Sequence, residues 1–150
     1  MKLWIGIDPG KNGSLCAIDE DNKCTFIDFK TKGLYGYIDF IKTIKADNTK
    51  KIETFFIEQV ASMPGQGVKS MFSFGQRFGE LEGMLQALEV GYQTVRPRIW
   101  QKNIGIKPKS SKKEIAITIK KVYPDAKFDG PRGGLLDGRA DALGIAHYGK

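Results

Sequence analysis

Short apolar runs separated by turn residues open the chain and predict three β-strands. The runs are Leu3–Ile7, Leu15–Ile18 and Cys24–Phe29, and Pro9–Gly13 and Asp21–Asn22 are the turn segments between them. Apolar runs bounded by Pro, Gly, Asn and Asp are typical of strands joined in hairpins. We therefore expect the chain to begin with an antiparallel meander.

After these strands, the spacing of the apolar positions predicts helices and strands in alternation. Spacings of three and four residues over Leu34–Ala46 predict an amphipathic helix. Ile52–Ile57 is almost continuously apolar, as expected of a central strand that is covered on both faces. A polar, glycine-rich loop at Gln59–Gly67 then leads into a long helix at Val68–Glu89 and a strand at Tyr92–Val95.

The last third of the chain predicts a basic loop followed by two helices. Residues 104–111 form the loop, and Ser111 is suited to cap a helix that runs to Tyr123. A final helix is expected over Leu135–Tyr148. The chain of 150 residues fits one domain, residues 1–150, with a single sizeable core.

Three glycines, Gly75, Gly79 and Gly83, recur at every fourth position of the long helix. Because each glycine costs a helix about 1 kcal/mol, this spacing indicates that another backbone approaches the glycine face closely. Packing against the protein's own sheet and a subunit interface both explain such an approach. Charged residues on the same helix exclude a membrane span.

The composition narrows the class of protein. No uncharged apolar stretch is long enough to cross a membrane, and the N-terminus enters a strand pattern directly. We therefore expect a soluble, cytoplasmic protein with no membrane partner. One histidine and two cysteines argue against a zinc site, so we expect Cys16 and Cys24 to be reduced core thiols and His147 to be a surface or core residue.

Positive charge is concentrated in one part of the chain. The net charge is +7, and residues 96–132 hold eleven Lys and Arg against three acidic residues. Such a segment is suited to a polyanion such as nucleic acid, and an ordinary solvated helix face is the alternative. The segment Gly65–Ser70 fails the phosphate-loop pattern because Val68 directly precedes Lys69 where glycine is required, so we expect no nucleotide cofactor. Lys69 is instead a candidate DNA contact.

Four acidic residues carry the chemistry that the sequence suggests. Asp8 follows the first strand, Glu58 ends the Ile52–Ile57 strand, and Asp137 and Asp141 lie four apart on the last helix. Acids at the same edge of adjacent strands, about 4.8 Å apart, converge, and helix residues four apart share a face. Such a cluster repels itself unless a divalent cation neutralises it, and oxygen ligands favour Mg²⁺ or Mn²⁺. A turn, a strand-end ion pair and a helix cap explain the first three acids singly, whereas no cap explains Asp141.

Several short segments, spread over nearly the whole chain, together match the pattern of one protein family more specifically than any single segment does. They are Gly6–Gly10 with Gly13, Ile57–Val60, Phe74–Gly79, Pro97–Gln101 with Gly105, Lys112 with Lys113, and Asp137–Leu143. These residues, in this order, resemble the RuvC-type Holliday junction resolvases of the RNase H-like superfamily, and the bacteriophage versions most closely.

The resemblance implies an α/β, RNase H-like fold. In that fold a five-stranded mixed sheet, a three-strand antiparallel meander plus two parallel strands, is flanked by helices. It also implies a homodimeric endodeoxyribonuclease of DNA recombination and repair that resolves four-way junctions by paired nicks. Asp8, Glu58, Asp137 and Asp141 would be catalytic and would hold Mg²⁺ or Mn²⁺, and we hypothesise two ions in each active site. Lys112 or Lys113 would offset charge that develops at the phosphate.

The resemblance and the charge pattern together suggest which basic side chains contact branched DNA. They are Lys69, Arg77, Lys102, Lys107, Lys109, Lys112, Lys113 and Arg132. Three positions depart from the family pattern. The last two acids lie four apart instead of three as in some members, Ala61 stands where some members have an aromatic residue, and Gln101 stands where a basic residue often follows the tryptophan.

Three rival functions remain open at this point. Actin-like ATPases and sugar kinases share the Gly-Ile-Asp-x-Gly opening, but they need a duplicated domain that 150 residues cannot hold. A related RNase H-like nuclease would act on RNA, on RNA–DNA hybrids or on branched DNA in general. A non-catalytic DNA-binding dimer would keep the basic surface without cleavage.

Overall fold

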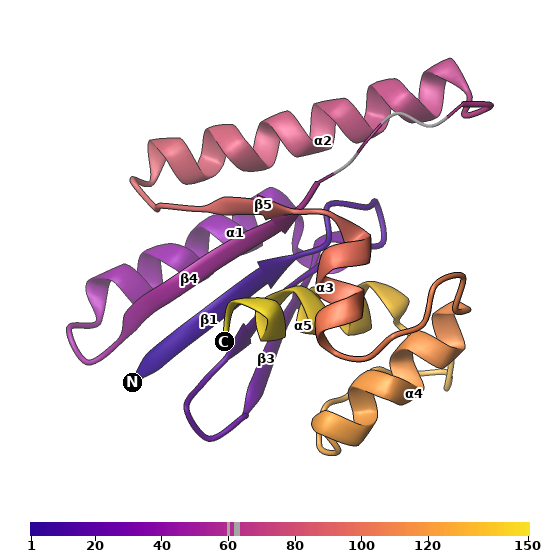
Figure 1. Ribbon diagram of the computed structural model, residues 1–150. Helices are drawn as coiled ribbons and strands as arrows, with labels where there is room; N and C mark the ends of the chain where they lie inside the picture. The colour runs from indigo at the N-terminus through magenta and orange to yellow at the C-terminus, as the bar shows by residue number, and fades with distance from the viewer. Residues whose placement is uncertain (60, 62–63) are drawn as a thin grey trace.

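A five-stranded mixed sheet forms the centre of the structure, a computed structural model that describes residues 1–59, 61 and 64–150. The strand order is β3-β2-β1-β4-β5 (Figure 1). The strands are β1 (Lys2–Ile7), β2 (Ser14–Ile18), β3 (Cys24–Asp28), β4 (Lys51–Glu58) and β5 (Gln93–Val95). β1, β2 and β3 pair antiparallel, whereas β1, β4 and β5 pair parallel. The predicted five-stranded mixed sheet is therefore confirmed, with an antiparallel meander on one side of β1 and parallel strands on the other.

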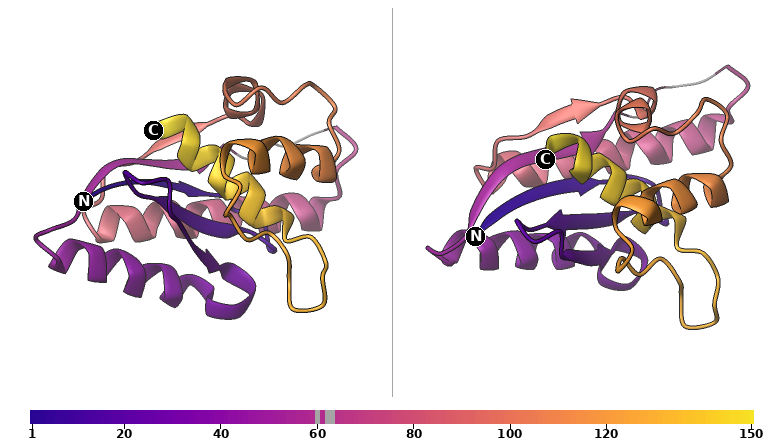
Figure 2. Two further views of the ribbon diagram at one scale, coloured as in Figure 1. Left: turned by 90° about the horizontal axis from the view of Figure 1, so that it is seen from below. Right: turned by 60° about the horizontal axis from the view of Figure 1, so that its bottom comes forward.

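The described residues form five helices, which cover the two faces of this sheet (Figure 2). On one face α1 (Phe29–Ala46) and α2 (Val68–Ala87) pack against apolar side chains of β1 and β4. On the other face lie α3 (Pro97–Asn103), α4 (Lys112–Val122) and α5 (Asp137–Gly149). The sheet thus separates two apolar clusters.

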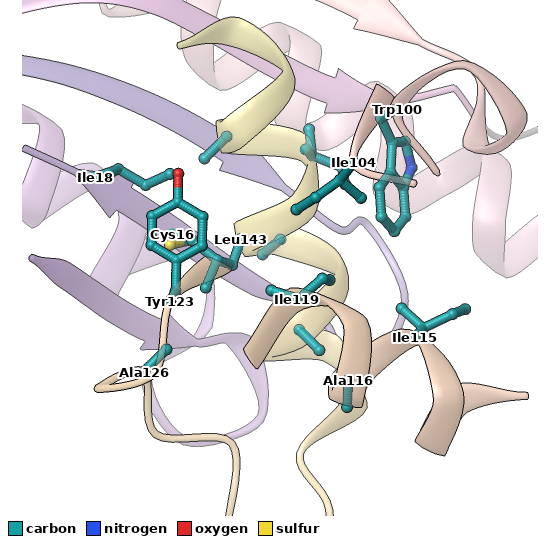
Figure 3. Close-up of a cluster of buried hydrophobic side chains, with 14 of the residues drawn as sticks. Cys16, Ile18, Trp100, Ile104, Ile115, Ala116, Ile119, Tyr123, Ala126 and Leu143 are labelled. Atoms are coloured by element: carbon teal, nitrogen blue, oxygen red, sulfur yellow. The ribbon is translucent and has the colours of Figure 1, made fainter. Parts of the chain in front are cut away.

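Alternation along β2 shows how the sequence produces these layers. Leu15 and Ala17 point into the α1–α2 cluster, and Cys16 and Ile18 point into the α3–α4–α5 cluster. Successive side chains of a strand face opposite sides, so a strand that is buried on both sides must be apolar throughout. Figure 3 shows Cys16 and Ile18 among the buried side chains of the second cluster.

The first helix begins earlier than its apolar spacing predicts. The strand β3 ends at Asp28, and α1 starts at Phe29 instead of Leu34. Gly33 interrupts the helix with a φ of 63°, a left-handed conformation that glycine adopts without steric cost. The predicted amphipathic stretch therefore corresponds to the part of α1 that follows this kink.

The short helix α3 is absent from the sequence prediction. Its seven residues bury only Trp100, so no repeated apolar spacing marks it. The available signal was Pro97, because proline is favoured at the first position of a helix. Val60, which ends the matching segment Ile57–Val60, lies outside the described residues.

The glycine face of α2 does not pack against the protein's own sheet, so that interpretation of the glycine spacing is wrong. Within the described residues, no atom lies within 4 Å of a side-chain carbon placed at Gly75, Gly79 or Gly83. The helix packs on the sheet through Leu81 and Leu85, which lie on a different face.

No helix in the described part of the chain has the length and apolar character needed to span a membrane.

Candidate functional site

The two strand-end acids leave the sheet at the same edge. β1 and β4 run parallel with Ile7 opposite Ile57, so Asp8 and Glu58 occupy the next positions of adjacent strands. Adjacent strands lie about 4.8 Å apart, and this spacing brings the two carboxylates into one neighbourhood. Both side chains are partly buried.

Helix α5 reaches this edge because glycine permits unusually close contact. A side-chain carbon at Gly6 of β1 would overlap the α5 backbone at Ala142 and Ala146. A side-chain carbon at Gly138 would overlap the carbonyl of Asn12 in the turn after β1. The N-terminal half of α5, which carries the other two acids, is therefore held against the end of β1.

The acids of α5 are not helix caps. Leu136 is the residue at the N-cap position, and Asp137 is the first residue of the helix. Asp141, one turn further on, is only 4% exposed, although an aspartate is rarely buried without a partner. The capping alternative for Asp137 is therefore wrong, and both acids require another explanation.

Burial and the repulsion between neighbouring acids raise the pKa of three carboxylates, those of Asp8, Glu58 and Asp141. Burial raises the pKa of Asp8 to about 6, and the Asp141 carboxylate adds to the rise while the Gly10 amide and Lys112 oppose it. Burial also raises the pKa of Glu58 to about 8, with a further contribution from Asp8. Asp141 and Asp137 contribute to the rise in the pKa of Asp8, Asp8 and Asp141 to that of Glu58, and Asp137 to that of Asp141, so the four acids are linked in one electrostatic cluster.

Lys112 partly neutralises the cluster. Its Nζ donates to Asp141 Oδ2 at 2.5 Å. Burial raises the pKa of Asp141 even though Lys112 opposes the rise. Burial lowers the pKa of Lys112, but the carboxylates outweigh this effect and the pKa is raised overall. Within the described residues Asp141 Oδ1 is buried without a hydrogen-bond partner.

The structure distinguishes Lys112 from its neighbour Lys113. Ser111 caps α4 in a reciprocal capping box with Glu114, as its position predicts, so α4 begins at Lys112. This start directs Lys112 to Asp141, whereas Lys113 is exposed and forms no ion pair within residues 1–59, 61 and 64–150. Of the two candidate catalytic lysines, Lys112 is therefore the one at the acids.

The donor set suits a hard divalent cation, although the acids are not gathered tightly. Carboxylate oxygens are the ligands that Mg²⁺ and Mn²⁺ prefer, and the unpartnered Asp141 Oδ1 is a buried oxygen of this kind. In the part of the chain that the structure describes, no three acidic, histidine or cysteine side chains are close enough to hold one ion as they stand. Like-charged carboxylates separate unless a cation lies among them. Metal binding would therefore require these side chains to move closer together.

Trp100 is a neighbour of the acids that the sequence analysis does not single out. Its indole Nε1 donates to Glu58 Oε2 at 2.7 Å, and this bond opposes the rise in the pKa of Glu58. The tryptophan is fully buried and comes from α3, the helix that apolar spacing also fails to predict. The signal in the sequence was its place in the segment Pro97–Gln101, which is part of the family resemblance but did not assign a role to the tryptophan.

A cavity of about 800 Å³ opens beside the strand-end acids. Its lining includes both strand-end acids, basic side chains and apolar side chains: Asp8, Glu58, Ala61, Phe74, Arg96, Arg98 and Ile99. Ala61, which stands where some family members have an aromatic residue, therefore lines the same cavity as the aromatic side chain of Phe74. Neither Phe74 nor the two arginines was singled out as a site residue from the sequence.

A smaller cavity of about 330 Å³ has a basic lining. It is lined by Pro9, Lys11, Lys69, Ser70, Ser73, Phe74 and Arg77. Pro9 and Phe74 also line the larger cavity, so the two are neighbours. Arg77 additionally stacks over Phe29 at 3.6 Å and lies 3.4 Å from Glu80. This predicted DNA contact therefore has structural partners as well.

The other predicted DNA-binding side chains lie on exposed surface. Lys102 is on α3, Lys107 and Lys109 are in the loop before α4, and Arg132 is in the turn before α5. The structure brings Lys112 to the acids but does not bring Arg132 or the loop lysines into contact with them.

The single histidine and the two cysteines were expected to be structural residues, and within the described residues none of them forms a hydrogen bond with the four acids. His147 Nδ1 lies 2.8 Å from the hydroxyl of Tyr123 on the partly buried side of α5. Cys16 and Cys24 are free thiols, the first buried and the second partly exposed.

Comparisons with known proteins support the fold. No family model and no curated protein matches the sequence. Among solved structures, the chain is similar to Thermus thermophilus RuvC in complex with a Holliday junction substrate, with 15% identity and a TM-score of 0.64 over 99% of this chain and 92% of that chain. It is also similar to a second Thermus thermophilus RuvC structure, with 17% identity and a TM-score of 0.58 over 96% of this chain and 93% of that chain. The chain therefore has a RuvC-like fold.

Proposed function

We propose that this chain is a divalent-metal-dependent endonuclease that resolves four-way DNA junctions as a homodimer. The observation that supports the proposal is the electrostatic linkage among Asp8, which follows β1, Glu58 at the end of β4, and Asp137 and Asp141 on α5. The RuvC-like fold and the sequence resemblance, in particular to the phage versions of that family, support the same conclusion.

The four acids are the proposed ligands of Mg²⁺, for which Mn²⁺ could substitute. When bound, such ions, as a pair in each site, lower the pKa of the attacking water and stabilise the leaving oxygen. The chain itself supplies the carboxylates, which must lose their protons before they can act as ligands. Asp8 is central because it interacts electrostatically with both acids of α5 and with Glu58.

Lys112 is the proposed cationic partner of the scissile phosphate. Its side chain is about half exposed although its Nζ contacts Asp141, so the ammonium group lies at the boundary between the acids and solvent. A phosphate placed against the acids would meet this charge. The contribution is electrostatic stabilisation of charge that develops during cleavage.

The DNA is proposed to lie across both cavities and the basic surface. Arg96 and Arg98 line the acidic cavity, and Lys69 and Arg77 line its basic neighbour. Five further basic residues are exposed and are proposed to contact the DNA outside the cavities: Lys102, Lys107, Lys109, Lys113 and Arg132. Phosphate contacts of this kind fix the position of DNA without reading its sequence, so recognition of a junction would depend on its shape.

Helix α2 is the proposed dimer interface. Its glycine face is open, and Val68, Met71 and Phe72 are exposed at its N-terminal end. Contiguous exposed apolar side chains mark interaction surfaces, and glycines allow two helix backbones to approach closely. A second copy of the chain would cover this face and place two active sites on one junction.

Cleavage of a panel of substrates tests this function. A mobile four-way junction, a flap, a fork, a linear duplex and an RNA–DNA hybrid would be compared with and without Mg²⁺. We expect paired nicks in the four-way junction and little cleavage of the duplex. Preferential cleavage of the hybrid or the flap would favour a broader RNase H-like nuclease, and binding without cleavage of any substrate would favour a DNA-binding dimer.

A further inference from the structure

Trp100 contacts both β4, which carries Glu58, and α5, which carries Asp137 and Asp141. The indole is fully buried in the α3–α4–α5 cluster, where Figure 3 shows it beside Ile104. Its Nε1 nevertheless donates to Glu58 Oε2 at 2.7 Å, at the end of β4. A tryptophan N–H can only donate, so a buried one requires an acceptor, and here the acceptor is one of the proposed metal ligands.

The ring is fixed on its other side by the helix that carries Asp141. A side-chain carbon at Gly144 would overlap the six-membered part of the indole and would come close to Ile119. Gly144 lies one turn after Asp141, so the ring rests on the same helix that presents that acid. The indole therefore contacts both α5 and Glu58, so a shift of either one would disturb its contact with the ring.

This arrangement has a chemical consequence for Glu58. A hydrogen bond from an uncharged donor fixes one carboxylate oxygen and stabilises the charged form that a metal ligand must adopt. Within the described residues no hydrogen bond is made to the other oxygen, Oε1, and we propose this oxygen as the one that would face a cation. In metal sites, partners that orient a ligand in this way typically contribute about 10- to 100-fold to metal affinity.

We propose that Trp100 is a positioning residue that orients Glu58 for metal binding and ties its place to that of Asp141. The inference rests on the proposed metal-dependent function. It differs from a purely structural role for Trp100, in which the indole only fills the core and Glu58 is an incidental acceptor.

A double-mutant cycle on the intact protein separates these roles, with Mn²⁺ affinity measured by calorimetry. Trp100→Phe keeps an aromatic ring and removes the N–H, and we expect it to weaken Mn²⁺ binding about 10- to 100-fold. In the Glu58→Gln background the same substitution should have little further effect, because the carboxylate ligand that the indole orients has been removed. Trp4→Phe, which changes the other tryptophan, is the control and should leave the affinity unchanged.

The outcomes distinguish this proposal from the metal centre itself. Equal losses from Trp100→Phe in both backgrounds, or no loss in either, would overturn the positioning role while the metal centre stands. Failure of the wild-type protein to bind Mn²⁺ would overturn the metal centre and the positioning role together.

A second measurement serves if Trp100→Phe does not fold. The Trp4→Phe protein has one indole, so its ¹H–¹⁵N spectrum contains one indole N–H signal, that of Trp100. We expect this signal to move when Mg²⁺ is added and when Glu58 is replaced by glutamine. A signal that responds to neither change would show that the indole does not act on Glu58.

Discussion

At the scale of single residues, burial of the acids opposes their negative charge, and Asp141 shows how the site balances the two. Asp141 is nearly inaccessible, yet it keeps a cationic partner in Lys112 and an oxygen without a partner among the described residues. Leaving a buried carboxylate oxygen unpaired costs free energy, which is expected where a binding function requires it. Of the adjacent lysines Lys112 and Lys113, only Lys112 forms an ion pair with an acid of the site.

Replacing each lysine separately tests this distinction. Lys112→Met removes the charge and keeps much of the stem, and we expect the nicking rate to fall about 100-fold because charge at the phosphate is no longer offset. Lys113→Met, its matched neighbour, should stay near the wild-type rate because Lys113 is exposed and makes no ion pair within the described residues. Similar losses in both variants, measured on the same junction, would argue against the specific role of Lys112.

At the scale of elements, the predictions succeeded where periodicity was clear and failed where it was interrupted. The five strands and the helices α2, α4 and α5 were predicted close to their observed limits because each shows a regular apolar pattern. The start of α1 was misplaced because Gly33 breaks its regular geometry, and α3 was missed because one buried tryptophan gives no period. The positions of Asp8 and Glu58 at strand ends followed directly from the apolar runs that precede them.

Contacts between elements could not be predicted in this way. The approach of α5 to β1 depends on the overlap that Gly6 avoids, which no spacing in the sequence reveals. The bond from Trp100 to Glu58 joins residues 42 positions apart and depends on the unpredicted helix α3. The glycine spacing of α2 indicated a close approach, but the sequence could not identify which face of which element would provide it.

A substitution on α2 tests the proposed dimer interface. Gly79→Leu places a side chain in open space, so the isolated subunit should tolerate it and should gain up to about 1 kcal/mol of helix stability. In a dimer the same side chain would separate the two helices. We therefore expect sedimentation velocity to show weaker self-association. Thr43→Ala on α1 is the control, and unchanged self-association in Gly79→Leu would place any dimer interface elsewhere.

For the whole molecule, the acid cluster links stability to pH and to metal. The pKa of Asp8 rises from 3.8 to about 6 on folding, and that of Glu58 rises from 4.5 to about 8. Between about pH 4 and pH 8 the folded protein therefore holds more of these protons than the unfolded chain, and their contribution to stability decreases as pH rises. Bound cations would oppose this loss because they favour the deprotonated carboxylates.

Thermal unfolding over this pH range measures the linkage. Without divalent metal we expect the melting temperature to fall between about pH 6 and pH 8, and we expect Glu58→Gln to flatten the fall because it removes the group that titrates last. Added Mg²⁺ should raise the melting temperature more at pH 8 than at pH 6. A melting temperature that rises over this interval without metal, or an equal effect of Mg²⁺ at both values, would contradict the coupled acid cluster.

Metal-dependent nicking of a four-way junction tests the central claim most directly. The wild-type protein, Asp141→Asn and the exposed control Asp125→Asn would be compared with Mg²⁺ and with chelator. We expect paired nicks from the wild-type protein and from Asp125→Asn only when Mg²⁺ is present, and a loss of about 100-fold or more in Asp141→Asn because a buried ligand has been removed. Full activity of Asp141→Asn, or cleavage by the wild-type protein in chelator, would contradict a metal-dependent site built from these four acids.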